Sequence, residues 1–155
     1  MAILIEQEIK APVEHVFQRL TDLDKWSETV SGIESVEKLT DGPVGVGTRF
    51  KETRVMFGKS CTEEMEFAEF RPNSMYAIEA HSCGCLYRTE IHCESSGAST
   101  KVRMEMNSKP LTLMAKLMSP MGWMMSGMMK KCLAQDLVDI KQAIEGGGTS
   151  PEPVG

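Results

Sequence analysis

MYAIEAHSCGCLYRTEIH, residues 75–92, alternates apolar and polar side chains on both sides of a Cys-Gly pair. Such alternation is typical of strands that bury one face. A two-residue loop at positions 83–84 would set Glu79 opposite Arg88, with apolar partners on the other face. Cross-strand pairs of this kind support a register. The stretch therefore predicts an antiparallel hairpin.

The same alternation continues on both sides of this hairpin. Gly, Pro, Asn and Ser punctuate it at the spacing of a meander. Strands are predicted over residues 2–10, 33–40, 47–57, 60–70, 74–82, 85–94 and 99–107. The sequence thus predicts a large antiparallel sheet.

Two further hairpins are predicted from paired charges. Their loops are placed at Gly58-Lys59 and at Ser96-Gly97. The resulting pairs are Arg54 with Glu63, Phe50 with Phe67, Glu90 with Arg103, Arg88 with Glu105, and Ile91 with Val102. An apolar set then faces inward, and it comprises Met65, Phe67, Ile78, Tyr87, Ile91, Val102 and Met104. Glu79, Arg88, Glu90 and Arg103 should face outward.

Two short helices are predicted after the first strand. Pro12 suits the first turn of a helix, and the apolar residues that follow it fall on one helical face. Thr21 or Asp22 can cap a second short helix that carries Leu23 and Trp26.

A long helix is predicted to close the fold. After Pro110 the apolar period returns to that of a helix. Pro120 must kink this helix or restart it, with Ser119 as a cap, and Gly146 ends it. Its apolar face is predicted to carry Leu113, Leu117, Met121, Met124, Met128, Cys132, Leu133, Leu137, Ile140 and Ile144.

Length and composition limit the classes of protein to consider. The 155 residues predict one domain over 1–145, followed by a flexible tail over 146–155. The net charge is −5 and no basic block is present, which argues against a nucleic-acid partner. No signal peptide or transmembrane stretch is predicted. We therefore expect a cytoplasmic protein whose five cysteines are reduced.

Three segments together resemble a known group of proteins. They are APVEHVFQRLTDLDKW (11–26), GPVGVGTRF (42–50) and EFRPNSMYAIEA (69–80), and a long helix follows them. The pattern resembles the SRPBCC superfamily, the START-like group that includes polyketide cyclase/dehydrase-like proteins. The resemblance implies an α+β helix-grip fold, in which a curved antiparallel sheet wraps a long C-terminal helix. It also implies a cavity for a hydrophobic small molecule; some members are enzymes, and many only bind or carry.

Methionine is concentrated in the predicted C-terminal helix. Seven of the thirteen methionines lie within residues 114–131. Four interpretations are open: a core helix, a pocket wall that adapts to its contents, a membrane-surface segment and a thioether metal site. The pocket wall would use Met121, Met124 and Met128.

Charged residues share the inward face of two predicted strands. Glu52, Arg54 and Glu63 fall on the same side as Phe50 and Phe67. One interpretation is a buried Arg54–Glu63 pair that anchors the carboxylate, phenol or carbonyl of a ligand. The other is that the strand ends project into water.

The segment HSCGC, residues 81–85, contains soft metal ligands. His81 and Cys85 should lie on opposite faces of the sheet, and Cys83 should lie in the loop. No second pair of ligands follows at metal-site spacing. We therefore predict ordinary hairpin residues, with neither a bound metal nor a cofactor.

The favoured function is binding or transport of a hydrophobic or aromatic small molecule such as a lipid, a quinone or a polyketide-like compound. The predicted ligand-binding residues are Phe50, Glu52, Arg54, Met65, Phe67, Ile78, Tyr87, Met104, Met121, Met124 and Met128. The alternative is a cyclase or dehydratase in which Glu63, Tyr87 or Arg54 moves protons. A third hypothesis is delivery of a quinone-like lipid to a protein partner. No stable membrane insertion is expected.

Overall fold

One antiparallel sheet and a long helix dominate the computed structural model of the chain, which describes residues 2–56, 58–82, 85–110, 112–113 and 119–147. The elements are β1 (Ala2–Ile9), α1 (Val13–Leu20), the short 3-10 helix η1 (Leu23–Lys25), α2 (Trp26–Thr29), β2 (Ile33–Lys38), β3 (Arg49–Met56), β4 (Lys59–Arg71), β5 (Met75–Ser82), β6 (Cys85–Ser96), β7 (Ser99–Pro110) and α4 (Ser119–Gly147). This is the predicted helix-grip arrangement.

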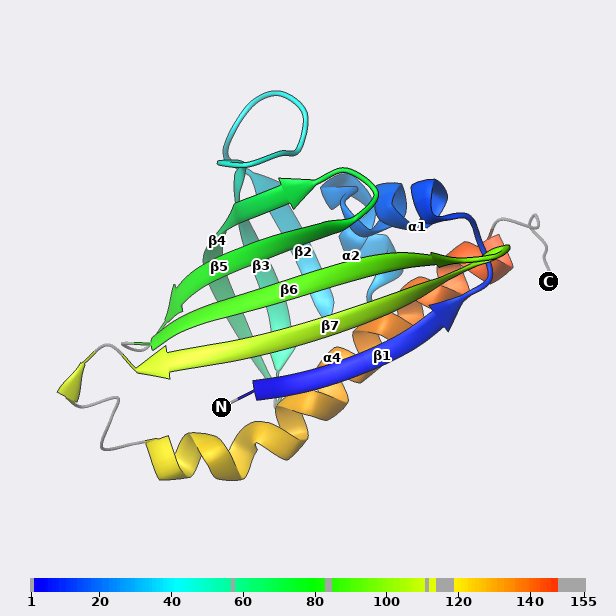
Figure 1. Cartoon of the computed structure of the whole chain (residues 1–155). Coiled ribbons are helices and arrows are strands. Elements are labelled where there is room, and N and C mark those ends of the chain that lie inside the picture. The colour runs from blue at the N-terminus through cyan, green and yellow to red at the C-terminus, as the bar shows by residue number, and fades with distance from the viewer. Residues whose placement is uncertain (1, 57, 83–84, 111, 114–118, 148–155) are drawn as a thin grey trace.

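The sheet is a meander with one added strand. Its order is β1-β7-β6-β5-β4-β3-β2, so β1 joins the β7 edge and the other strands follow chain order. Bulges interrupt the register between Phe67 and Glu69 and between Ile33 and Ser35. Because a bulge bends its strand and increases its twist, the sheet curves. Figure 1 shows this curved sheet over α4, with α1 and α2 at one end.

The quoted hairpin has the predicted register. Glu79 pairs with Arg88, and Ser82 pairs with Cys85 across the loop. The loop residues 83–84 themselves lie outside the described residues.

The other two hairpins correct the predicted register by two residues. Met56 pairs with Lys59, so Arg54 lies opposite Cys61 and Phe50 opposite Met65. Ser96 pairs with Ser99, so Glu90 lies opposite Glu105, Arg88 opposite Asn107, and Ile91 opposite Met104. Charge pairing suggested the wrong loops because a slip of two residues leaves every side chain on its own face.

The glycine positions explain the loops that the chain adopts. Gly58 and Gly97 have φ values of +79° and +65°, in the left-handed region that favours glycine. Gly97 is the first residue of its loop, which suits a II′ turn, whereas it was predicted to be second. Gly58 is second, whereas it was predicted to be first.

The predicted faces of the sheet are confirmed. Phe67, Ile91, Val102 and Met104 are buried, and Met65 and Ile78 pack partly against the same core. A chain of ring contacts joins Phe17 of α1 and Trp26 of α2 to the sheet. Its members on the sheet are Phe50, Phe67, Phe70 and Tyr76. Aromatic clusters of this kind dominate core energetics.

The end of α1 differs from the predicted capping. The Thr21 hydroxyl donates to the Phe17 carbonyl at 2.9 Å, so it closes α1 instead of opening the next helix. Asp22 stands at the start of η1 without a side-chain capping bond. The Trp26 indole donates to the Leu20 carbonyl at 3.0 Å. This last bond joins α2 to the end of α1.

The long helix starts at the residue that was predicted to cap it. Helix α4 begins at Ser119, immediately before Pro120, and buries Leu137, Ile140 and Ile144. Leu113 is 75% exposed and does not belong to the buried face, which is a correction. The side chains of Met121, Met124 and Met128, like residues 114–118 and 148–155, lie outside the described residues.

Polar contacts fix the C-terminal half of α4. Asp139 accepts from the Ser31 backbone N–H at 3.0 Å and from its hydroxyl at 2.9 Å. Glu145 accepts from the Lys10 backbone N–H at 2.7 Å. Because Ser31 follows α2 and Lys10 follows β1, this half of the helix has a defined place beneath the sheet.

Candidate functional site

A cavity of about 470 Å³ lies between the inner face of the sheet and α4. Its described apolar lining comprises Leu20, Trp26, Val30, Ile33, Met65, Tyr76, Ile78, Ala80, Tyr87, Ile91, Met104, Met106, Leu133 and Ile140. A volume of this size is within the range of small-molecule sites. The cavity is therefore the candidate site.

The predicted site residues divide into three groups. Glu52, Arg54, Glu63, Met65, Ile78, Tyr87 and Met104 line the cavity. Phe50 and Phe67 are fully buried in the aromatic core beside it and are not among its lining residues. The three methionines of α4 have side chains outside the described residues. Their proposed binding role stays a prediction.

A polar cluster interrupts the apolar wall. Arg54 Nε lies 3.3 Å from Glu52 Oε2, and Arg54 Nη1 lies 2.9 Å from Asp136 Oδ2. The pair predicted for Arg54 was Glu63, which is wrong, because strand β4 is shifted by two residues and α4 presents Asp136 instead. We call Glu52, Arg54 and Asp136 the inner cluster.

The inner cluster is shielded from water. The side chains of Glu52, Asp136 and Arg54 are 9%, 11% and 14% exposed. The alternative that these strand ends project into water is therefore wrong for Glu52 and Arg54. Buried charges are retained only when they are paired, and here one guanidinium serves two carboxylates.

Burial and ion pairing act in opposite directions on the pKa values of Asp136 and Arg54. Burial raises the pKa of Asp136 to about 6, and Glu52 and Asp139 add to this rise while Arg54 opposes it. Burial alone would lower the pKa of Arg54, but the attraction of Glu52 and Asp136 outweighs it and the net change is upward. Asp136 can therefore exchange a proton near neutral pH while Arg54 stays charged.

Asp136 was missed at the level of the sequence. It stands between Leu133 and Ile140, at the spacing that puts all three on one face of a helix. A carboxylate inside an apolar helical stripe is a sign of a buried acid, and the sequence shows this sign at Asp136. Tracing the apolar positions alone passed over it.

The two cavity tyrosines have different surroundings. The Tyr76 hydroxyl donates to the Leu20 carbonyl at 3.2 Å, and burial raises its pKa above the ordinary value. That bond joins β5 to the end of α1, so Tyr76 is a packing residue. Tyr87 also lines the cavity, on β6.

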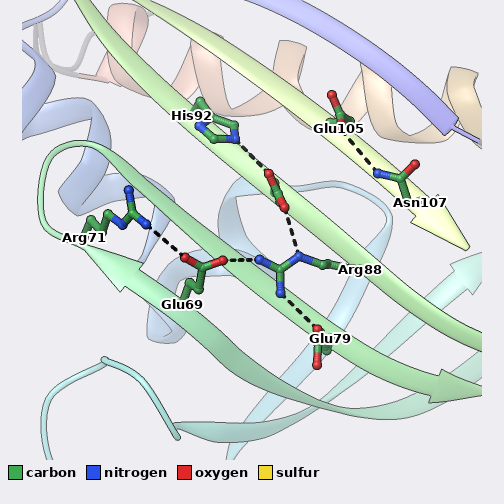
Figure 2. Close-up of polar contacts among 8 residues, drawn as sticks. Glu69, Arg71, Glu79, Arg88, His92, Glu105 and Asn107 are labelled. Carbon is green, nitrogen blue, oxygen red and sulfur yellow. Dashed lines mark hydrogen bonds and ion pairs between the residues drawn. The ribbon is translucent and has the colours of Figure 1, made fainter.

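The outer face of the sheet carries a second arginine cluster. Arg88 Nη1 and Nε each lie 2.9 Å from a carboxylate oxygen, of Glu79 and Glu90 respectively, and Arg88 also contacts Glu69. Figure 2 shows Arg88 between Glu69 and Glu79, with Arg71 and His92 at the ends of the network. We call Arg88 with Glu69, Glu79 and Glu90 the outer cluster.

The HSCGC segment has the facing that was predicted. His81 pairs with Leu86 and Cys85 with Ser82, so His81 and Cys85 lie on opposite faces of the sheet. Cys83 lies outside the described residues. Within the described ranges, no three His, Cys, Asp or Glu side chains gather as a metal-ligand group.

A search of the helices in the described part of the chain finds none with the length and hydrophobicity to span a membrane.

Comparisons with known proteins agree with this architecture. The model of the family described as polyketide cyclase/dehydrase and lipid transport matches residues 3–145. The Zhui aromatase/cyclase of Streptomyces sp. R1128 superposes with a TM-score of 0.75 at 13% identity, covering 97% of this chain and 99% of that one. The protein TTHA0849 of Thermus thermophilus gives 0.74 at 19% identity, covering 96% and 100%.

A START superfamily protein of Mycobacterium smegmatis gives a TM-score of 0.67 at 14% identity, with coverage of 94% of this chain and 95% of that one. No curated protein matches the sequence. At these identities the structural likeness shows the fold. The family match spans most of the chain, and the chain belongs to the polyketide cyclase/dehydrase and lipid transport family of the START-like SRPBCC superfamily.

Proposed function

We propose that the chain binds a hydrophobic or aromatic small molecule, of lipid, quinone or polyketide-like size, in the cavity under the sheet. The observation that carries this proposal is the cavity of about 470 Å³ with its largely apolar lining. An apolar space of this kind costs stability unless something fills it, because its wall atoms lack contact partners. In a binding protein, the bound ligand supplies the missing contacts and completes the packing.

Filling the cavity from within tests the proposal. Ala80 lines the cavity and is 7% exposed, so Ala80→Trp places a large ring in the space that the ligand would occupy. We expect the affinity for the uncharged fluorescent probe N-phenyl-naphthylamine to fall about tenfold or more. Titration by fluorescence, beside a thermal melt of the same sample, measures both binding and folding.

The matched control is Glu66→Trp. Glu66 is exposed on the outer face of β4, so the added ring lies away from the cavity. This variant should bind the probe like the wild type. Equal binding by the Ala80→Trp variant, or no uptake of the probe by the wild type, would contradict the proposal.

A second candidate function is acid–base catalysis in the same cavity, of the cyclase or dehydratase kind. Asp136 favours it, because a buried carboxyl group with a pKa of about 6 can take up and return a proton near neutral pH. Arg54 Nη1, which lies 2.9 Å from Asp136 Oδ2, holds this carboxyl group in place at the cavity wall. Glu63 and Tyr87 line the same space.

Proton exchange separates this candidate from simple binding. An enzyme of this kind should speed the exchange of the α-hydrogens of an aryl β-diketone with deuterium from heavy water, since enolisation removes a proton from carbon and returns a deuteron. The rate is measured by NMR. We expect the Asp136→Asn variant to lose the acceleration and to keep binding. If the wild-type protein leaves the exchange at its uncatalysed rate, the catalytic candidate is contradicted and ligand binding stays the proposed function.

A further inference from the structure

Acidic side chains outnumber basic ones in the described wall of the cavity. This inference rests on the proposed binding function, because the charge of the wall limits which ligands the cavity can hold. Within the described part of the wall, the carboxylates are Glu52, Glu63 and Asp136, and the basic side chain is Arg54. The cavity therefore carries more negative than positive charge when these carboxyl groups are ionised.

The guanidinium of Arg54 is already engaged. Its Nε lies 3.3 Å from Glu52 and its Nη1 lies 2.9 Å from Asp136. An entering carboxylate would have to compete with both of these partners and would approach a third acid, Glu63. Since the cluster is shielded from water, the repulsion is screened much less than at a surface. The incoming group would also lose its hydration.

From this arrangement we infer that the cavity selects uncharged ligands that carry a carbonyl or similar hydrogen-bond acceptor, and that it rejects carboxylates such as free fatty acids. The inner cluster provides the discrimination. Asp136 supplies the donor when it is protonated, and Glu52 keeps Arg54 from receiving an anionic head group.

Acidification should strengthen this binding. The ionisable groups that share the cavity with Asp136 are Glu52 and Arg54 of β3, Cys61 and Glu63 of β4, Tyr76 of β5 and Tyr87 of β6, and Asp139 acts on it along α4. The protonated carboxyl of Asp136 donates to a ligand carbonyl, whereas the carboxylate cannot. Because its pKa lies at about 6 in the free protein, the affinity for a ketone should rise as the pH falls from about 7.5 to about 5.5.

Three naphthalene probes of matched shape test the inference: acetylnaphthalene, naphthoate and ethylnaphthalene, all substituted at the same ring position. Affinities are measured by fluorescence or calorimetry near neutral pH. We expect acetylnaphthalene to bind several-fold tighter than ethylnaphthalene and about tenfold or more tighter than naphthoate. Naphthoate binding as tightly as acetylnaphthalene would overturn the inference and leave the proposed function intact. Failure of all three probes to bind would overturn both.

Variants assign the effect to the inner cluster. Glu52→Gln removes one negative charge and frees part of Arg54, so naphthoate affinity should rise about tenfold. Glu6→Gln changes the net charge equally on β1, where Glu6 is exposed, and should alter nothing. An unchanged naphthoate affinity in the Glu52→Gln variant would overturn the assignment. The Asp136→Asn variant keeps a donor without titrating, so its ketone binding should lose the pH dependence. The wild-type pH series decides the same point should that variant fail to fold.

Discussion

Two arginines on opposite faces of the same sheet make similar contacts in different surroundings. Arg54 faces the cavity with a side chain that is 14% exposed, and its partners Glu52 and Asp136 are 9% and 11% exposed. Arg88 faces outward, and its side chain is 27% exposed. The side chains of its partners Glu69, Glu79 and Glu90 are between 27% and 38% exposed. Figure 2 shows the labelled members of the outer cluster across the strands.

The difference in burial reverses the effect on the carboxyl groups. Hydrogen bonds from Arg88 and His92 lower the pKa of Glu90. Burial raises the pKa of Asp136 to about 6, although Arg54 lies equally close to it. Desolvation therefore outweighs ion pairing inside the cavity, and ion pairing outweighs desolvation outside. The ligand selection and proton transfer that we propose depend on the buried inner cluster, whereas the outer cluster links neighbouring strands.

Removing the inner arginine should give the largest loss. Arg54→Met leaves Glu52 and Asp136 buried without a cation, and the free energy of unfolding should fall by about 3–5 kcal/mol at neutral pH. A urea titration of the variant beside the wild type measures this. The loss should shrink at low pH, where Asp136 is protonated. A variant as stable as the wild type at neutral pH would show that the inner cluster is solvated.

Acidification should stabilise the ligand-free protein over part of the pH range. The folded-state pKa of Asp136, about 6, lies above its ordinary value of 3.8, so the folded state takes up the proton first as the pH falls. Between about pH 7 and pH 5 this group alone should add about 1 kcal/mol to the free energy of unfolding. Urea titrations across this range test it.

The Asp136→Asn variant is the control for this pH effect, since it lacks the titrating group and should not show the rise. Glu90, Asp139 and Glu145 have lowered pKa values, so their stabilising contributions are lost only below their ordinary values of 4.5, 3.8 and 4.5. A wild type whose stability falls steadily from neutral pH would contradict the assignment.

Removing the outer arginine should give the smallest loss. Arg88→Met breaks contacts that are open to water and salt, so we expect a change of about 1 kcal/mol or less. Raising the ionic strength should reduce the gap between this variant and the wild type, and should leave the Arg54→Met gap nearly unchanged. Denaturant titrations at low and high salt compare the two variants. Equal losses in both would remove the distinction between the clusters.

The sequence predicted the fold well where side-chain alternation was enough. The strands, the inward faces and the start of α4 at Ser119 followed from periodicity and from Pro120. The registers of two hairpins did not, because charge pairing cannot distinguish slips of two residues. Gly58 and Gly97 adopt left-handed backbone conformations in those two loops. The sequence shows that glycines are present there, but it does not show whether each is the first or the second residue of its loop.

The candidate site was predicted in part for a related reason. Strand parity placed Glu52, Arg54 and Glu63 toward the cavity. The second partner of Arg54 is Asp136, which lies 82 positions further along the chain on a different element. Periodicity predicts which face of a strand or helix a residue occupies, but it does not predict which residues of two different elements are in contact. The contact between β3 and α4, and the buried acid that it creates, therefore needed the structure.

The titration of Asp136 shows whether burial outweighs ion pairing in the inner cluster. Its carboxyl carbon can be followed by ¹³C NMR in the free protein and with acetylnaphthalene bound, and the Asp136→Asn variant identifies the signal. We expect a pKa of about 6 for Asp136 in the free protein and a higher pKa in the complex, because the ligand carbonyl accepts a hydrogen bond from the protonated group. Titration near the ordinary value of 3.8, unmoved by the probe, would contradict it.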